Sequence, residues 1–238
     1  MNPQPWSETD ILGPEESPFD NLASAYDAWF EDEGKLIFAI EVEAFRKILP
    51  SLPEPWLEVG AGSGRFAKAL KIKTGVDPSA KLSAIARRRG INVFPGRGEE
   101  RLFDEETFGT VFLIVTLCFV DSPVAVLQEA HRILKPEGKV VLGLVLRDSP
   151  WGQYYLTKKN EGHRFYRYAT FHSYQEVTQL LEQTCFAVEK VISTLFQKPA
   201  KVETKETPLE IFSPDAGFTI VVAMKTPEES EKQTKRPT

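Results

Sequence analysis

The stretch Trp56-Leu57-Glu58-Val59-Gly60-Ala61-Gly62-Ser63-Gly64-Arg65-Phe66 joins a short apolar run to three alternating glycines and then to the start of a helical pattern. Glycine has no Cβ, so a backbone built from it turns sharply and lets a ligand lie directly against it. A strand, a glycine turn and a helix in this order also direct free N–H groups and the positive end of the helix dipole at the turn. The stretch therefore predicts the rim of a pocket for a nucleotide-like ligand.

The spacing of the glycines separates the classes of nucleotide site. A dinucleotide fingerprint requires Gly-x-Gly-x-x-Gly, and the last position of that pattern is Arg65 here. A P-loop requires Gly-Lys followed by Ser or Thr, which does not occur after Gly64. The remaining pattern, Glu58-x-Gly60-x-Gly62-x-Gly64, resembles motif I of the class I S-adenosylmethionine (SAM) methyltransferases. The alternative at this point is a tight strand-to-helix turn that holds no ligand.

A second strand, predicted over residues 74–77, ends in the acid Asp77. In the family that the chain resembles, an acid at this position accepts hydrogen bonds from both ribose hydroxyls of SAM. A carboxylate suits that task because it only accepts and can take two donors at once. Asp77 could equally cap the next helix, and both roles are compatible at the carboxyl end of a strand. The resemblance extends to Pro78 and to Leu82, whose family counterpart lies along the adenine.

The third strand, residues 91–95, is followed by Gly96-Arg97-Gly98-Glu99-Glu100, where the family usually reads Gly-Asp-Ala-Glu. The acidic second residue of the family often takes the adenine amino group, and Arg97 stands in its place. By resemblance we expect the N–H of Gly98 to contact the adenine and the carboxylate of Glu99 or Glu100 to replace the missing acid.

A nearly continuous apolar run, Phe108 to Val120, indicates a central parallel strand covered on both faces. It is too short to span a bilayer, which takes about 20 apolar residues. Thr116 falls at its carboxyl end, beside the methionine part of SAM in the family. The turn Leu134-Lys135-Pro136-Glu137-Gly138 before a fifth strand is a further resemblance.

The matching pieces run in the family's order from Leu57 to Val145, and the chain is nearest the small-molecule branch that includes the ubiquinone-biosynthesis-like enzymes. The resemblance implies an α/β fold: a Rossmann-like, seven-stranded, mostly parallel sheet with helices on both faces and an antiparallel last strand. It implies SAM as cofactor and S-adenosylhomocysteine (SAH) as product. The residues expected to contact the cofactor are Tyr26, Glu58, Gly60, Ala61, Gly62, Gly64, Asp77, Pro78, Leu82, Gly98, Glu99 and Thr116.

Length and composition limit the number of domains and the class of partner. With 238 residues, 42% of them hydrophobic, the chain fits one domain with a cap. Its net charge of −5 argues against nucleic acid as the main partner. Two distant cysteines indicate neither a disulfide framework nor a metal site, and with no secretory signal we expect a cytoplasmic protein. We expect a flexible N-terminus over 1–18, a methyltransferase domain over 19–225 and a disordered tail over 226–238.

Two segments are candidate covers for the pocket. The first is the pair of N-terminal cap helices, 19–49, where Tyr26-Asp27-x-Trp29 resembles an element that closes over SAM. Tyr26 and Trp29 would line the site, although the same spacing also fits a plain amphipathic helix. The helix over residues 34–49 is expected to be purely structural.

The second cover is the aromatic insert after the fifth strand, 151–175, which holds five of the six tyrosines. Tyrosine offers an apolar face with a polar handle, and the local excess of Lys and Arg suits an anionic or aromatic substrate. Tyr154, Tyr155, Tyr166 and His172 are the candidate substrate contacts. The alternatives are a small packed subdomain and a contact between two copies of the chain.

The sequence thus predicts methyl transfer from SAM to an unidentified small molecule by in-line displacement. No catalytic residue is assigned, because a base is needed only if the nucleophile arrives protonated; His163 and His172 have a suitable pKa. The expected partner is a small molecule, rather than nucleic acid or a membrane, and a homodimer is left open. One alternative is an RNA or protein methyltransferase, but the Asn-Pro-Pro-Tyr-like motif typical of such enzymes does not follow the fourth strand. The other is a non-catalytic SAM-binding regulator, and Arg97 is the only residue that supports it.

Overall fold

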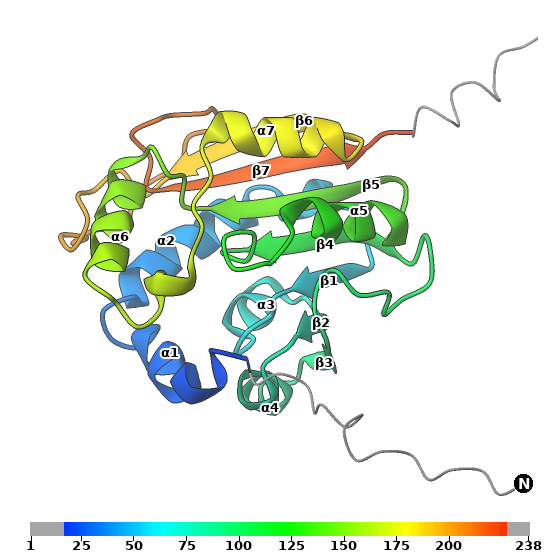
Figure 1. Cartoon of the computed structure of the whole chain (residues 1–238). Coiled ribbons are helices and arrows are strands. Elements are labelled where there is room, and N and C mark those ends of the chain that lie inside the picture. The colour runs from blue at the N-terminus through cyan, green and yellow to red at the C-terminus, as the bar shows by residue number, and fades with distance from the viewer. Residues whose placement is uncertain (1–16, 228–238) are drawn as a thin grey trace, which may run out of the picture.

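The computed structural model describes residues 17–227 of the chain (Figure 1). The flexible N-terminus and the disordered tail expected from the sequence lie almost wholly outside these residues. At the end of the described chain, the backbone N–H of Thr226 donates to the Cys185 carbonyl over 2.8 Å.

Seven strands form a single sheet, as the sequence predicts. Their order is β3-β2-β1-β4-β5-β7-β6. The bounds are β1 Trp56–Val59, β2 Thr74–Asp77, β3 Asn92–Pro95, β4 Phe108–Ile114, β5 Leu134–Leu144, β6 Phe186–Thr194 and β7 Phe218–Lys225. The pairs among β1 to β5 are parallel, and β7 runs antiparallel to both β5 and β6. The predicted fold class is therefore confirmed.

The strand order places a switch point between β1 and β4. From β1 the chain first adds β2 and β3 on one side and then returns to add β4 and β5 on the other. Open α/β sheets bind ligands in the crevice at the carboxyl ends of the strands beside such a point. In Figure 1 the arrowheads of β1, β4 and β5 point toward the side of the molecule where α1 and α6 lie.

Helices cover both faces of the sheet. Their bounds are α1 Ala23–Trp29, α2 Lys35–Arg46, α3 Arg65–Leu70, α4 Ala80–Arg88, α5 Pro123–Ile133, α6 Pro150–Asn160 and α7 Tyr174–Gln183, with 3-10 turns η1 Asp20–Leu22, η2 Leu49–Ser51 and η3 Tyr166–Tyr168. One core cluster joins α2 and α3 to Phe112, and the other joins α5 and α7 to Val111. Adjacent residues of β4 thus serve opposite faces, as the pleat requires.

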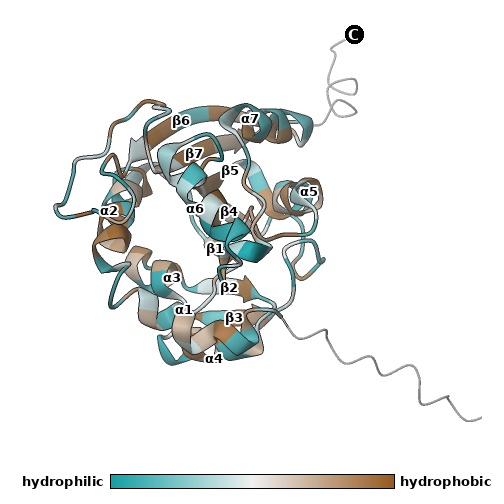
Figure 2. Ribbon diagram, turned by 60° about the vertical axis from the view of Figure 1, so that its left-hand side comes forward, coloured by the Kyte–Doolittle hydropathy of each residue, from teal (hydrophilic) through white to brown (hydrophobic). Residues whose placement is uncertain are grey.

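The hydropathy pattern follows this arrangement. Figure 2 shows mostly hydrophobic ribbon along β7, and both colours on β6, α2, α4 and α5. Mixed helices are those that bury one face against the sheet and expose the other.

Serine begins several of these helices. The hydroxyls of Ser79, Ser122, Ser149 and Ser173 each accept a backbone N–H from the first turn of the helix that follows. An N-cap of this kind stabilises a helix start by about 1 kcal/mol. Proline occupies the first helical position of α5 and α6, where its missing N–H costs nothing. These caps fix where α4, α5 and α6 leave the edge of the sheet that carries the glycine turn.

Two segments differ from the expected element boundaries. Strand β5 begins at Leu134, so the Leu-Lys-Pro-Glu-Gly turn lies inside a longer, irregular strand. The long connection between β6 and β7 pairs with the sheet edge, where Ser193 and Leu209 exchange backbone hydrogen bonds of 2.8 and 2.9 Å. Within residues 17–227, none of the helices combines the length and apolar character that crossing a membrane requires.

Candidate functional site

The glycine turn after β1 is held between the next strand and the β4 loop. The N–H groups of Gly60 and Ala61 donate to the Val76 carbonyl over 2.8 and 3.0 Å. Gly60 has a φ of +72°, and a Cβ there would lie 2.4 Å from the Thr116 side chain. Gly64 has a φ of +76°, and a Cβ would meet that of Ala86 on α4 at 2.9 Å. Neither position therefore accepts a larger residue without displacing its neighbour.

Gly62 is the open face of this turn. Its nearest neighbour in the direction of a Cβ is the ring of Tyr26, at 3.5 Å. Its N–H donates to Asp77 Oδ2 over 2.7 Å, and the N–H of Ser79 donates to Asp77 Oδ1 over 2.8 Å. Each oxygen retains acceptor capacity, so Asp77 can still take two donors from a ligand. Burial raises the pKa of Asp77 to about 6, against the lowering effect of its two backbone donors.

Glu58 lies beneath the turn without full hydrogen bonding. Its side chain is buried and its Oε2 has no partner among the described residues. Burial raises the pKa of Glu58 well above its usual range, and the nearby charge of Asp77 raises it further. Two acids under an open glycine cradle fit a ligand that brings hydroxyl and ammonium donors. SAM carries both, in its ribose and its amino-acid part, so the residues present fit that group.

The adenine side of the site departs from the family pattern in a way that the structure explains. Arg97 forms an ion pair with the exposed Asp121, so its charge is compensated locally. Glu99 Oε1 accepts the N–H of Ser122 over 3.3 Å, at the start of α5. A Cβ on Gly98 would lie 2.6 Å from Val59, which keeps the loop close to β1. Leu82 is buried in the first turn of α4.

Pro78 is exposed and directly follows Asp77 at the end of β2. Ala61 is buried within the glycine turn. The structure thus brings the predicted cofactor residues together along one edge of the sheet, at the ends of β1, β2, β3 and β4, with Tyr26 above them.

An ion-pair cluster fastens α1 over this edge. Asp27 accepts from Arg65 Nε over 2.9 Å and from Arg89 over 2.8 Å, and Arg65 also pairs with Glu31. Both arginines hold the pKa of Asp27 well below its usual range, although burial opposes them. Arg65, the residue that breaks the dinucleotide pattern, therefore ties the start of α3 to α1. Arg89, from the basic run at the end of α4, serves the same cluster.

The loop after β4 begins with a strained residue. Val115 has a φ of +52°, a conformation rare for a β-branched side chain, and its N–H donates to the Gly143 carbonyl over 2.8 Å. Strain of this kind persists where surrounding structure enforces it, often at functional sites. The Cys118 carbonyl accepts the N–H of Thr170 over 2.7 Å, which joins the loop to the insert. Burial raises the pKa of the Cys118 thiol to about 12, so it is no nucleophile.

A cavity of about 420 Å³ lies between this loop, α1, α2 and the insert. Aromatic side chains form most of its wall. The predicted residues Tyr26, Trp29, Tyr154, Tyr155 and Tyr166 all line it, together with Val115, Cys118 and Phe119 from the β4 loop. The loop and Tyr26 therefore border both this cavity and the glycine turn.

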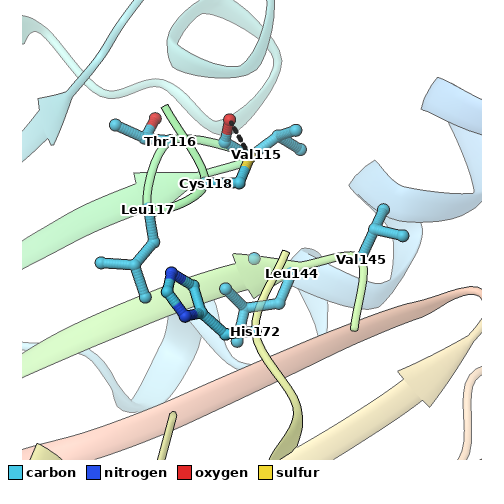
Figure 3. A pocket seen from close by; sticks show the side chains of 8 residues that line it. Val115, Thr116, Leu117, Cys118, Leu144, Val145 and His172 are labelled. Atoms are coloured by element: carbon cyan, nitrogen blue, oxygen red, sulfur yellow. Dashed lines mark hydrogen bonds between the residues drawn. The ribbon is translucent and has the colours of Figure 1, made fainter. Parts of the chain in front are cut away.

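His172 lies elsewhere. It borders a smaller hollow of about 10 Å³ with Thr116, Leu117 and Leu144, and this hollow shares Val115, Cys118 and Val145 with the larger cavity. Figure 3 shows the imidazole beside the two leucines. A hollow of that size holds about one water molecule. Burial lowers the pKa of His172, and its Nε2 has no partner among the described residues. The structure does not bring this predicted substrate contact together with the others.

His163 does line the larger cavity, with its ring stacked 4.7 Å from that of Tyr166. Burial lowers its pKa, as do the charges of Arg164 and Lys158. A neutral imidazole packed on a tyrosine belongs to the aromatic wall.

The basic residues of the insert have partners within it. Lys158 pairs with Glu161 over 3.1 Å, and Lys159 donates to the Ala169 carbonyl over 2.6 Å. Arg164 and Arg167 lie over the rings of the residues that follow them, at 4.8 and 4.5 Å from the centroids. The positive charge thus holds the insert together, which weakens the argument for an anionic substrate.

Sequence reasoning missed the contribution of α2. Ile37 and Glu41 line the cavity, so this helix is not purely structural. Glu41 is buried, and burial raises its pKa to about 8. A signal was present: Glu41 follows Ile37 by four residues and precedes Ala44 by three, which places an acid within the apolar stripe.

Comparison with known proteins agrees with this geometry. The family model described as a methyltransferase domain matches residues 57–142. A crystal structure from Thermotoga maritima, described as a SAM-dependent methyltransferase and possible histamine N-methyltransferase, is 35% identical, with a TM-score of 0.81 over 88% of this chain and 98% of that one.

An uncharacterised protein of Methanocaldococcus jannaschii is 40% identical over 191 residues, which are 79% of this chain and 91% of that protein. Geranyl diphosphate C-methyltransferase from Streptomyces coelicolor, solved with SAH, is 14% identical at a TM-score of 0.56 over 93% of this chain and 89% of that one, a likeness of fold alone. The chain belongs to the class I SAM-dependent methyltransferases.

Proposed function

We propose that the chain transfers the methyl group of SAM to a small-molecule acceptor held in the cavity between α1, α2 and α6. The observation that carries the proposal is the shared wall: Tyr26 and the Val115–Phe119 loop border both the glycine turn and the cavity. The cavity volume of about 420 Å³ lies within the range of small-molecule sites. The Thermotoga relative, described as a possible histamine N-methyltransferase, supports the same class of acceptor.

The residues of the glycine edge would hold the cofactor. Asp77 has two acceptor positions left for ribose hydroxyls, and the turn from Gly60 to Gly64 offers an open backbone surface at Gly62. Gly98 and Leu82 lie on the adenine side, and Thr116 lies against the turn. The bound cofactor supplies a methyl group activated by a positively charged sulfur.

The chain contributes alignment and exclusion of water. The ring of Phe19 packs edge-to-face against Tyr26 at 6.1 Å and against Phe119 at 5.2 Å between centroids. These three rings form an aromatic layer along one side of the cavity. Tyr155 and Tyr166, stacked at 4.2 Å, also line the cavity and would orient the acceptor. Fixing two reactants in line replaces a costly encounter in solution, which is the main contribution such an enzyme makes.

Calorimetry with SAM and SAH, followed by methyl-transfer assays, tests the proposal. We expect both ligands to bind and a panel of small amines, phenols and thiols to include an acceptor. Absence of binding at millimolar concentration would refute the function. Transfer to bulk RNA with strong salt dependence, and to none of the small molecules, would overturn the class of acceptor.

A further inference from the structure

One buried carboxyl group in the cavity wall has no role in the site described so far. Glu41 lies on α2 and is 6% exposed. It lines the cavity, and neither a hydrogen bond nor an ion pair joins its carboxyl group to another group in residues 17–227. A buried acid normally has a partner, because an unpaired charge away from water is costly. The Glu41 carboxyl group is therefore free to bind a donor that enters the cavity.

The groups around Glu41 are aromatic. Tyr155 and Tyr166 stack at 4.2 Å, and Tyr155 lies nearly parallel to Phe171 at 6.3 Å. The charge of Glu41 helps raise the pKa of Tyr26, Tyr155 and Tyr166, with burial as the larger cause, so these phenols stay neutral. Faces of such rings attract cations, most strongly where water is excluded.

The other charges at the cavity do not satisfy Glu41. The remaining titratable groups in the wall are Glu33, Cys118, Tyr154, Lys158, His163 and Arg164. Glu33 and Arg164 are exposed, and Lys158 is occupied by Glu161. Among the described residues, then, the cavity holds one buried acid within an aromatic wall and no buried cation.

We infer that Glu41 binds the ammonium group of an amine acceptor and takes its proton, so that the enzyme methylates nitrogen. The inference rests on the proposed function and narrows its substrate class to amines with an aromatic or aliphatic body. A carboxylate substrate is disfavoured, because it would add a second negative charge beside Glu41.

The protons and electrons balance without a further reactant. The ammonium group has no free electron pair until it gives one proton to the Glu41 carboxylate. The amine lone pair then forms the new N–C bond, the C–S bond of the methyl donor breaks, and its electron pair stays on sulfur. The product leaves as a methylated ammonium ion, and Glu41 releases its proton to solvent. Since burial raises the pKa of Glu41 to about 8, the free group carries a proton at neutral pH. It loses that proton to solvent when the ammonium ion binds, and the resulting carboxylate can then take a proton from the ammonium group.

Calorimetry on the SAH-loaded full chain tests this assignment with defined probes. The probes are 2-phenylethylamine, histamine and the neutral isostere 2-phenylethanol. At pH 7 the free Glu41 is mostly protonated, so a bound ammonium ion should expel about one proton. Titrations in phosphate and Tris, whose ionisation enthalpies differ, measure that proton directly. We expect release with an amine and none with the alcohol.

Matched variants locate the effect. Glu41→Gln should weaken amine binding about 10- to 100-fold, abolish proton release and leave SAH affinity unchanged. Glu43→Gln is the control, because Glu43 lies on the same helix and pairs with Arg46 on the surface. Glu33→Gln should lose much less amine affinity than Glu41→Gln.

The inference is overturned if the wild-type chain binds neither amine more tightly than the alcohol, if Glu41→Gln keeps amine affinity, or if Glu33→Gln loses as much. These results differ from failure of the proposed function. That failure appears as the absence of SAH binding to the wild-type chain, whereas SAH binding without a preference for amines removes the amine inference alone.

Discussion

Asp77 serves the structure and the proposed site at the same time. One carboxylate oxygen holds the N–H of Gly62 and the other holds the N–H of Ser79, at 2.7 and 2.8 Å. The same residue thus sets the glycine turn and the start of the segment that leads into α4. Removing the side chain would free two backbone donors as well as any ligand contact, so alanine is a poor test.

Asp77→Asn is the sharper substitution. Asparagine keeps an acceptor oxygen and the side-chain shape but cannot accept on both sides. We expect SAH affinity to fall by roughly 1.5–3 kcal/mol, the range for a hydrogen bond to a charged group. Calorimetry measures the loss, and a thermal melt shows whether the variant is folded. An unchanged affinity in a folded variant would exclude a ribose contact by Asp77.

Glu41 should make stability depend on pH. Its pKa is raised from 4.5 to about 8, so the folded chain holds an extra proton between these values and wild-type stability falls as pH rises through that window. Glu41→Gln lacks the effect. It should match the wild type at pH 4.5 and exceed it at pH 9 by on the order of 4 kcal/mol, as an upper bound. Urea unfolding at both pH values measures the difference, which must be larger at pH 9.

These residues show which parts of the site the sequence reveals. Glu58, Gly60, Gly62 and Asp77 fall within short local motifs, so their spacing alone predicts one edge of the sheet. Glu41 is different. Its place in the apolar stripe of α2 predicts burial, but the cavity that it lines depends on how α2 packs against an insert more than a hundred positions away.

At the scale of elements, Asp27 joins α1 to α3 and to the end of α4 through Arg65 and Arg89. The Asp27, Arg65 and Arg89 side chains are 19%, 16% and 18% exposed, so the cluster is largely shielded from solvent. A second fastening lies at the start of the same region, where Asp20 accepts the Ser79 hydroxyl over 2.7 Å. The cover over the glycine turn is thus fixed by two acids.

Asp27→Asn should loosen that cover. It removes the charge from both arginine contacts, and we expect a loss of about 1–3 kcal/mol in the free energy of unfolding. Amide exchange over residues 20–30 should become faster, and SAH should bind more weakly because Tyr26 is held less firmly. Asp32→Asn, at an exposed position just after α1, is the matched control. Unchanged exchange over 20–30 would show that the cluster does not hold α1.

Element boundaries followed the sequence where hydrophobic period and caps agreed. The strand over 74–77 lies where local signals predict it, whereas the run Phe108–Val120 predicts a longer central strand than β4, which ends at Ile114. Local signals do not predict the β4 loop, because the left-handed backbone of Val115 comes from tertiary packing against β5 and opposes the conformational preference of valine. The division of the aromatic insert between the cavity and the hollow of His172 likewise depends on packing.

At the scale of the whole molecule, the two covers contact each other as well as the sheet. Tyr26 of α1 meets Phe165 of the insert at 5.9 Å between ring centroids. The insert in turn holds the β4 loop through Thr170 and Cys118. Because α1, the insert and the β4 loop contact one another around the cavity, we expect them to tighten together when ligands bind.

Hydrogen exchange can detect that coupling. SAH should slow exchange over 20–30 and also over 163–171, since a ligand that stabilises one cover stabilises the contacts it shares with the other. Phe165→Leu shortens the link while keeping an apolar side chain. It should preserve protection over 20–30 and reduce protection over 163–171, whereas Phe196→Leu, a partly exposed phenylalanine outside the cavity, should change neither. If SAH protects both segments of Phe165→Leu as strongly as those of the wild type, the two covers respond to the cofactor independently.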